Sequence, residues 1–289
     1  MKRTPWWIAV AAVVFVGITW SSRGFLRDSL EAWRKPALPP PTPFVAEVST
    51  PSSAPSLCQK GFCVPTSTPP GKAAPTGTAP VPAPVTPPPS AEPTTTSLPT
   101  QVNLAVPFLA QAPKQNWDMP YQEACEEASL IMVNAYFADN TKAFTPDTGD
   151  RAILDLVAFE EAQGLAVDIT AAEAATLIPK YFSKRKARVI QNPTITQIRE
   201  YLAKGIPVIA AADGKALKNP NFRNGGPPYH MLVIKGYLPD GRWIVNDPGT
   251  RKGADYIYDR EILFKAIRDW NGGDVPRGTP SVIIMEPEA

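Results

Sequence analysis

Apolar residues recur at helical spacing along much of the second half of the chain. In the stretch 124–137 they fall at Ala124, Ala128, Ile131 and Ala135, which places them on one face of a helix. Further helices are predicted from similar patterns and from start and stop signals such as the Thr170–Glu173 capping box. These helices are 150–163, 170–182, 193–204 and 259–270.

Short apolar runs bounded by turn residues predict strands after most of these helices. The predicted strands are 206–211, 231–237, 242–246 and 280–285, and an extended entry segment is predicted at 106–113. The sequence Leu238-Pro-Asp-Gly241 is a strong turn signal, so 231–237 and 242–246 are expected to form a hairpin. Helices followed by an antiparallel sheet predict an α+β fold.

Proline sets the domain organisation. Of the 35 prolines, 19 lie between Pro36 and Pro99, among Ser, Thr, Ala and Val. Such a segment has too few large apolar side chains to offset the entropy of ordering, so it is predicted to be a disordered linker. The expected boundaries are a membrane segment and its flank at 1–35, the linker at 36–103, and one folded domain at 104–289.

The N-terminus has the pattern of a membrane-targeting segment. Met1-Lys-Arg3 precedes the apolar run 6–20, which has tryptophans at both ends. An uncleaved signal-anchor is predicted, with a cleaved signal peptide as the alternative. The expected location is the cell membrane, crossed once, with the C-terminal domain outside the cytoplasm. Basic residues between Arg23 and Lys35 favour the opposite orientation and a cytoplasmic domain.

Cys58 and Cys63 stand close together in the predicted linker. Gly61 lies between them and allows a turn, so a disulfide that closes a small loop is the natural interpretation in an oxidising compartment. A reduced pair is the alternative. A zinc site would need more ligands than the chain offers, which leaves no metal prediction.

The charge of the predicted domain argues against nucleic-acid binding. Residues 101–289 carry 21 Lys and Arg against 23 Asp and Glu, so no net positive surface is expected. The one basic cluster, Lys184-Arg-Lys186 with Arg188, is interpreted as a solvated helix end.

Three residues could form a nucleophilic site. Cys125 falls in the first turn of the helix 124–137, where free N–H groups favour a thiolate, although a lone cysteine is often only a small buried hydrophobe. His230, the only histidine, begins the strand 231–237, and folding the hairpin brings it opposite residues 247–249. Asp247 would then lie within reach of the imidazole. By itself Asp247-Pro-Gly249 is a turn sequence, but nucleophile, base and orienting carboxylate together indicate a thiol hydrolase.

Residues 104 to about 286 resemble the peptidase C39-like family, a branch of the papain-like cysteine hydrolases. The matching pieces are Val106-Pro-Phe-Leu-Ala-Gln111, Cys125-Glu-Glu-Ala-Ser-Leu-Ile-Met132, Gly205-Ile-Pro-Val-Ile209, His230-Met-Leu-Val-Ile-Lys-Gly-Tyr237 and Asn246-Asp-Pro-Gly249. The resemblance implies a papain-like fold with N-terminal helices packed on an antiparallel sheet. It also implies Cys125 as nucleophile, His230 as general base and acid, and Asp247 as the orienting carboxylate.

The resemblance further implies a glutamine that donates a hydrogen bond to the oxyanion. Gln111 matches that position best, and Gln122 is the rival. Two acids follow Cys125 where many members have small residues. Glu126 is expected to face the substrate and to select a cationic or polar group, while a solvent-facing position is the alternative for Glu127.

The expected function is a membrane-tethered cysteine peptidase or amide hydrolase that works through a thioester on Cys125. Its partners would be a peptide or cell-envelope amide substrate and, through the N-terminal helix, the membrane. No metal or organic cofactor is called for. A non-catalytic peptide- or glycan-binding module on the same fold is the alternative, and thiol-dependent acyl transfer is a third hypothesis.

Overall fold

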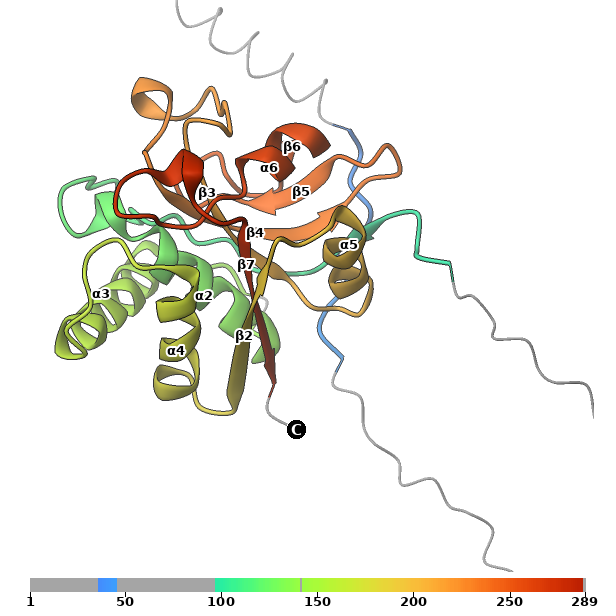
Figure 1. Cartoon of the computed structure of the whole chain (residues 1–289). Helices are drawn as coiled ribbons and strands as arrows, with labels where there is room; N and C mark the ends of the chain where they lie inside the picture. Colours follow the sequence, from blue (N-terminus) through green and yellow to red (C-terminus); the bar gives the residue numbers. More distant parts are fainter. Residues whose placement is uncertain (1–35, 46–96, 141, 288–289) are drawn as a thin grey trace, which may run out of the picture. The chain divides into compact units, whose positions relative to one another are not determined.

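The computed structural model describes residues 36–45, 97–140 and 142–287 (Figure 1). The predicted membrane segment and the Cys58–Cys63 pair lie outside the described residues. Among the residues that are described, no helix is both long and apolar enough to cross a membrane.

Five α-helices lie where the sequence pattern predicts helices. They are α2 (Cys125–Phe137), α3 (Pro146–Ala162), α4 (Ala171–Tyr181), α5 (Ile195–Ala203) and α6 (Arg260–Ala266). The predicted capping box at Thr170 is confirmed: its side chain accepts from Glu173 N–H, and the Glu173 carboxylate accepts from Thr170 N–H.

Two helix boundaries differ from the prediction. Helix α3 begins earlier, at Pro146, because Thr145 and Thr148 form a reciprocal cap ahead of it. Helix α6 ends earlier, at Ala266, because the next residues pair with the end of a strand instead. Arg268 N–H donates to Ala211 C=O, and Asp213 N–H donates to Ala266 C=O.

The strands form one antiparallel sheet of seven strands, in the order β2-β7-β3-β4-β5-β6, with β1 paired to β4. The predicted strands correspond to β3 (Val208–Ala212), β4 (His230–Tyr237), β5 (Trp243–Asn246) and β7 (Ser281–Pro287). Three strands were not predicted: β1 (Val102–Asn103), β2 (Arg185–Gln191) and β6 (Tyr256–Tyr258). Together with the five helices, this is the α+β architecture expected from the sequence.

The basic cluster at 184–188 forms a strand, so its interpretation as a helix end is wrong. Lys184 has a positive φ of 61°, which reverses the chain after α4, and β2 then runs along β7 at the edge of the sheet. Arg188 on β2 pairs with Glu286 on β7. A charged edge strand of this kind resists pairing with other chains.

Helix α2 is buried around almost its whole circumference. It packs against α3 and against strands β4 and β7 of the sheet (Figure 1). Helix α4 packs against β2 and β7, and α5 packs against β3 and β4. A helix that is buried on nearly all sides lies in the protein interior, whatever its few polar residues. Its N-terminus therefore delivers Cys125 to the inside of the molecule.

Residues 36–45, which fall within the predicted linker, contact the folded domain. Thr42 N–H donates to Asn103 C=O at 2.7 Å, and Ala105 N–H donates to Thr42 C=O at 2.8 Å. The Phe44 ring meets the rings of Tyr136 and Phe137 edge to face. The folded unit thus includes part of the stretch that composition alone assigns to the linker.

Candidate active site

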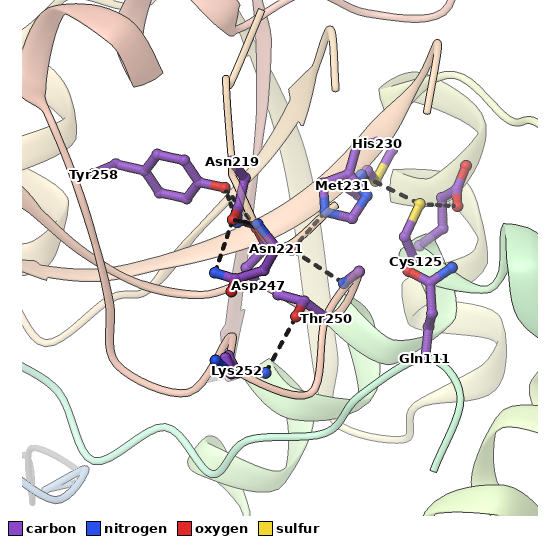
Figure 2. A network of polar contacts seen from close by, with 12 residues as sticks. Gln111, Cys125, Asn219, Asn221, His230, Met231, Asp247, Thr250, Lys252 and Tyr258 are labelled. Atoms are coloured by element: carbon purple, nitrogen blue, oxygen red, sulfur yellow. Dashed lines mark hydrogen bonds and ion pairs between the residues drawn. The ribbon is translucent and has the colours of Figure 1, made fainter. Parts of the chain in front are cut away.

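Cys125 is the first residue of α2, and only 5% of it is exposed. Its Sγ donates a hydrogen bond to Glu126 Oε2 at 2.9 Å and accepts one from the Met231 N–H at 3.3 Å. Met231 directly follows His230 on β4. The thiol therefore lies against the strand that carries the predicted base (Figure 2).

His230 and Asp247 are in direct contact, as the hairpin register predicts. Strand β4 pairs with β5 from Val233 opposite Asn246, so residue 230 comes level with the loop just after Asp247. His230 Nε2 lies 2.8 Å from Asp247 Oδ1, and both side chains are almost completely buried. Because Nε2 faces the carboxylate, Nδ1 is the ring nitrogen left to exchange a proton elsewhere.

Asp247 is held ionised by a set of donors. Burial opposes its charge, but His230, the Tyr258 O–H at 2.6 Å and the Gly249 N–H at 3.0 Å together hold the pKa of Asp247 below its usual value. Asn219 Nδ2 also donates to Asp247 Oδ2 at 3.0 Å. A buried carboxylate with this many donors is well suited to orient an imidazole.

Asn219, Tyr258 and Phe222 were not predicted as site residues. Tyr258 arrives on β6, a strand of three residues, and Asn219 lies in an irregular loop. The Phe222 ring packs edge to face on the His230 imidazole at 5.3 Å. No periodic or motif signal marks these positions, because their role comes only from the way separate segments meet around His230 and Asp247.

Gln111 lies in the interior and ties the two sides of the site together. Its Nε2 donates to the carbonyls of Tyr121 and Gln122, both at 2.9 Å, and its backbone N–H donates to Pro248 C=O. A side-chain amide has two N–H groups, so both are already used here. Gln122, by contrast, is exposed and lines a cavity beside the site.

The two acids after Cys125 are buried, so the solvent-facing position considered for Glu127 is wrong. Glu126 is 1% exposed and its carboxylate contacts the thiol, and its contact with substrate stays a prediction. Glu127 is 6% exposed, and the Glu160 carboxyl donates a hydrogen bond to it. Burial raises the pKa of Glu127 to about 7 and that of Glu160 to about 10, and it raises the pKa of Glu126 as well.

The expected thiolate is not favoured in this arrangement. Burial is the largest effect on Cys125, followed by the negative charge of Glu126, and together they raise the pKa of the thiol well above its usual value. The Met231 N–H acts in the opposite sense but is outweighed. Position at a helix N-terminus does not by itself activate a cysteine that is buried beside a carboxylate.

A cavity of about 410 Å³ opens next to these residues. The segment ahead of α2 lines one side, and the loops before His230 and after Asp247 line the other. In the described ranges 36–45, 97–140 and 142–287, no group of three His, Cys, Asp or Glu side chains is arranged to hold a metal ion.

Comparison with known proteins identifies the family. A model of the Peptidase_C39 like family matches residues 103–272. Among solved structures, a protein from Bacillus anthracis described as a C39-like peptidase shares 15% identity with a TM-score of 0.42, over 65% of this chain and 99% of its own. A fragment of prointerpain A from Prevotella intermedia shares 15% identity with a TM-score of 0.40, over 66% of this chain and 74% of its own. No curated protein sequence matches. Because the family model covers more than half of the chain, the protein belongs to the Peptidase_C39 like family.

Proposed function

We propose that the protein is a cysteine peptidase or amide hydrolase in which Cys125, His230 and Asp247 act together. The observation that carries this proposal is the 2.8 Å contact between His230 Nε2 and the buried carboxylate of Asp247. The Cys125 sulfur lies beside this pair, where it accepts a hydrogen bond from the N–H of Met231, the residue after His230. Nucleophile, base and orienting group are the parts that thiol catalysis needs, and the family is one of peptidases.

The reaction begins when the thiol proton moves from its hydrogen bond with Glu126 to the imidazole of His230. Cys125 gives its proton to His230 rather than sharing it with Glu126, and the sulfur attacks the substrate carbonyl carbon. The tetrahedral intermediate collapses, the C–N bond breaks, and the imidazolium of His230 protonates the leaving amine. Water then attacks the thioester with His230 as base, which releases the acid and restores the thiol.

The oxyanion needs donors at the start of α2. We assign one to the backbone N–H of Cys125 and the other to the exposed side chain of Gln122, because both N–H groups of Gln111 are held by carbonyls. Gln111 then serves to fix the turn ahead of the nucleophile. For Gln111 to donate instead, one of these two bonds would have to break.

Replacement of Cys125 by Ser in the full chain tests this function. Digestion of a degenerate peptide library, followed by mass spectrometry, should show cleavage by the wild type and none by C125S, with an unchanged circular dichroism spectrum. The matched control is the double variant Cys58→Ser/Cys63→Ser, which removes the other two cysteines and should cleave normally. Undiminished cleavage by C125S would refute the proposal.

One observation favours a second function, a non-catalytic peptide-binding module. The thiol is 95% buried and hydrogen-bonded to a carboxylate, which resists ionisation. This alternative predicts that no acyl group becomes attached to Cys125 with any thioester or amide donor. It also predicts equal peptide affinity for the wild type and C125S. A covalent acyl adduct mapped to Cys125 by mass spectrometry would exclude it.

We also propose that the domain works at the outer face of the cell membrane. The charged and apolar pattern of residues 1–20 and the paired cysteines at 58 and 63 support this location. Membrane fractionation and protease accessibility in intact spheroplasts test it. Recovery in the soluble fraction, or protection from external protease, would count against a tethered external domain.

A further inference from the structure

The cavity beside the candidate site has a marked charge. Three cationic side chains line it, Arg223 from the loop before His230 and Arg251 and Lys252 from the loop after Asp247, and no Asp or Glu is among its lining residues. Among the described residues none of the three forms an ion pair, and Arg251 donates only to the neutral side chain of Gln115 at 2.9 Å. Three cations are thus gathered around one space without anions to balance them.

The same cavity adjoins the reacting groups. Gly249 lies between the cavity and the imidazole of His230. The space is so narrow that a Cβ atom added at Gly249 would lie 2.8 Å from His230 Cε1 and 3.0 Å from Phe222 Cε1. On the opposite side, Gln122 lies three residues before Cys125. A peptide bound in this cavity would therefore lie beside His230, next to the segment that leads into Cys125.

We propose that this cavity binds a carboxylate of the substrate, so that the protein acts on acidic peptides. The inference rests on the function proposed above and names its substrate class. Arginine presents a planar fork of donors that matches a carboxylate, and Lys252 adds a third positive charge. Trp117, which is half-buried in the wall, offers a flat apolar surface for the peptide chain next to the charged group.

The positions of Glu126 and Glu127 agree with a positively charged cavity. From the sequence, Glu126 is expected to select a cationic or polar group, but Glu126 is buried against the thiol and Glu127 against Glu160. Neither lines the cavity. The charges that a bound peptide would meet there are positive.

The test uses the full chain and a degenerate peptide library. Mass spectrometry of the products should show Asp or Glu enriched about tenfold over Asn or Gln at one position within about three residues of the cleaved bond, a factor that corresponds to ~1.4 kcal/mol. The triple variant Arg223→Gln/Arg251→Gln/Lys252→Gln should lose this enrichment. The matched control Lys180→Gln/Lys186→Gln/Lys204→Gln removes the same charge from exposed positions outside the cavity and should keep it.

The outcomes separate this inference from the proposed function. Cleavage without acidic enrichment, or enrichment that survives in the cavity variant, overturns the inference and leaves the hydrolase standing. If the wild type cleaves nothing, the uncleaved library is equilibrated with C125S and the bound peptides are identified after ultrafiltration. Retention of acidic peptides that the cavity variant does not retain supports the inference without catalysis, and unselective retention overturns it.

Discussion

Burial and the side chain next to Cys125 raise the pKa of its thiol, although the thiol lies at the start of a helix. Cys125 occupies the first position of α2 and accepts the Met231 N–H, and both features favour a thiolate. Burial and the adjacent Glu126 act against them and raise the pKa of the thiol. Displacement of Glu126 from the sulfur would remove the second-largest of these causes.

Replacement of Glu126 by Gln should make the thiol easier to ionise. It removes the second-largest cause of the raised pKa of Cys125 and keeps the size of the side chain. The rate of iodoacetamide modification at Cys125, followed by mass spectrometry against pH, should rise at lower pH in E126Q than in the wild type. Glu200→Gln, an exposed change on α5, is the control and should leave the profile unchanged. Identical profiles for E126Q and wild type would contradict this interpretation.

The buried pair Glu127 and Glu160 should make stability depend on pH. The pKa of Glu127 is raised from 4.5 to about 7, so between these values the folded protein holds a proton that the unfolded chain releases. This contribution is fully present below pH 4.5 and is lost as pH rises through 7, by on the order of 3 kcal/mol.

The measurement is urea unfolding between pH 5 and pH 8. The free energy of unfolding of the wild type should fall over this range. Glu127→Gln should make the fall less steep, while Glu160, whose pKa is raised to about 10, still contributes to it. Glu200→Gln should follow the wild type. A wild-type stability that rises with pH over the same interval would show that Glu127 is not protonated in the folded state.

At the scale of elements, local signals set where helices start, and strand pairing sets where one of them, α6, stops. Thr145, Thr170 and Thr194 each form a capping box, and α3, α4 and α5 begin directly after these threonines, although the sequence pattern placed the start of α3 later, at residue 150. Helix α6 ends where its chain pairs with the end of β3, which no local signal announces.

The cap of α4 provides a test at this scale. Thr170→Ala removes the oxygen that accepts the Glu173 N–H, and we expect a loss of about 1 kcal/mol in the free energy of unfolding. Ser183→Ala, an exposed change after the end of α4, is the control and should cost less than about 0.5 kcal/mol. Equal losses of unfolding free energy in the two variants would show that the Thr170 cap does not stabilise the protein.

At the scale of the whole molecule, a segment distant in sequence completes the folded unit. Residues 36–45 lie against β1 and the C-terminal end of α2, and Phe44 packs on Tyr136 and Phe137 with ring centroids 5.8 Å and 4.9 Å apart. These contacts join residues 36–45 to the domain that begins after the linker. The segment thus adds apolar contacts to the domain.

Phe44→Ala should lower the free energy of unfolding by about 1–2 kcal/mol, because it removes two aromatic contacts from a half-buried site. Chemical denaturation of the full chain measures this. Val45, the next residue, is 75% exposed, and Val45→Ala should change stability by less than about 0.5 kcal/mol. A Phe44→Ala variant as stable as Val45→Ala would mean that the segment does not stabilise the domain.

The sequence by itself determined the features that depend on short-range patterns. Apolar spacing and capping residues located the helices, and the turn at 238–241 set the hairpin register that brings His230 to Asp247. The sequence did not predict β2, whose charged residues were interpreted as a helix end, or β6, which is only three residues long. Tertiary structure alone decided the burial of Glu126, the donors around Asp247 and the gathering of Arg223, Arg251 and Lys252 around one cavity. These features join segments far apart in the chain, and their energies depend on burial and on the distance between charges, neither of which a local pattern contains.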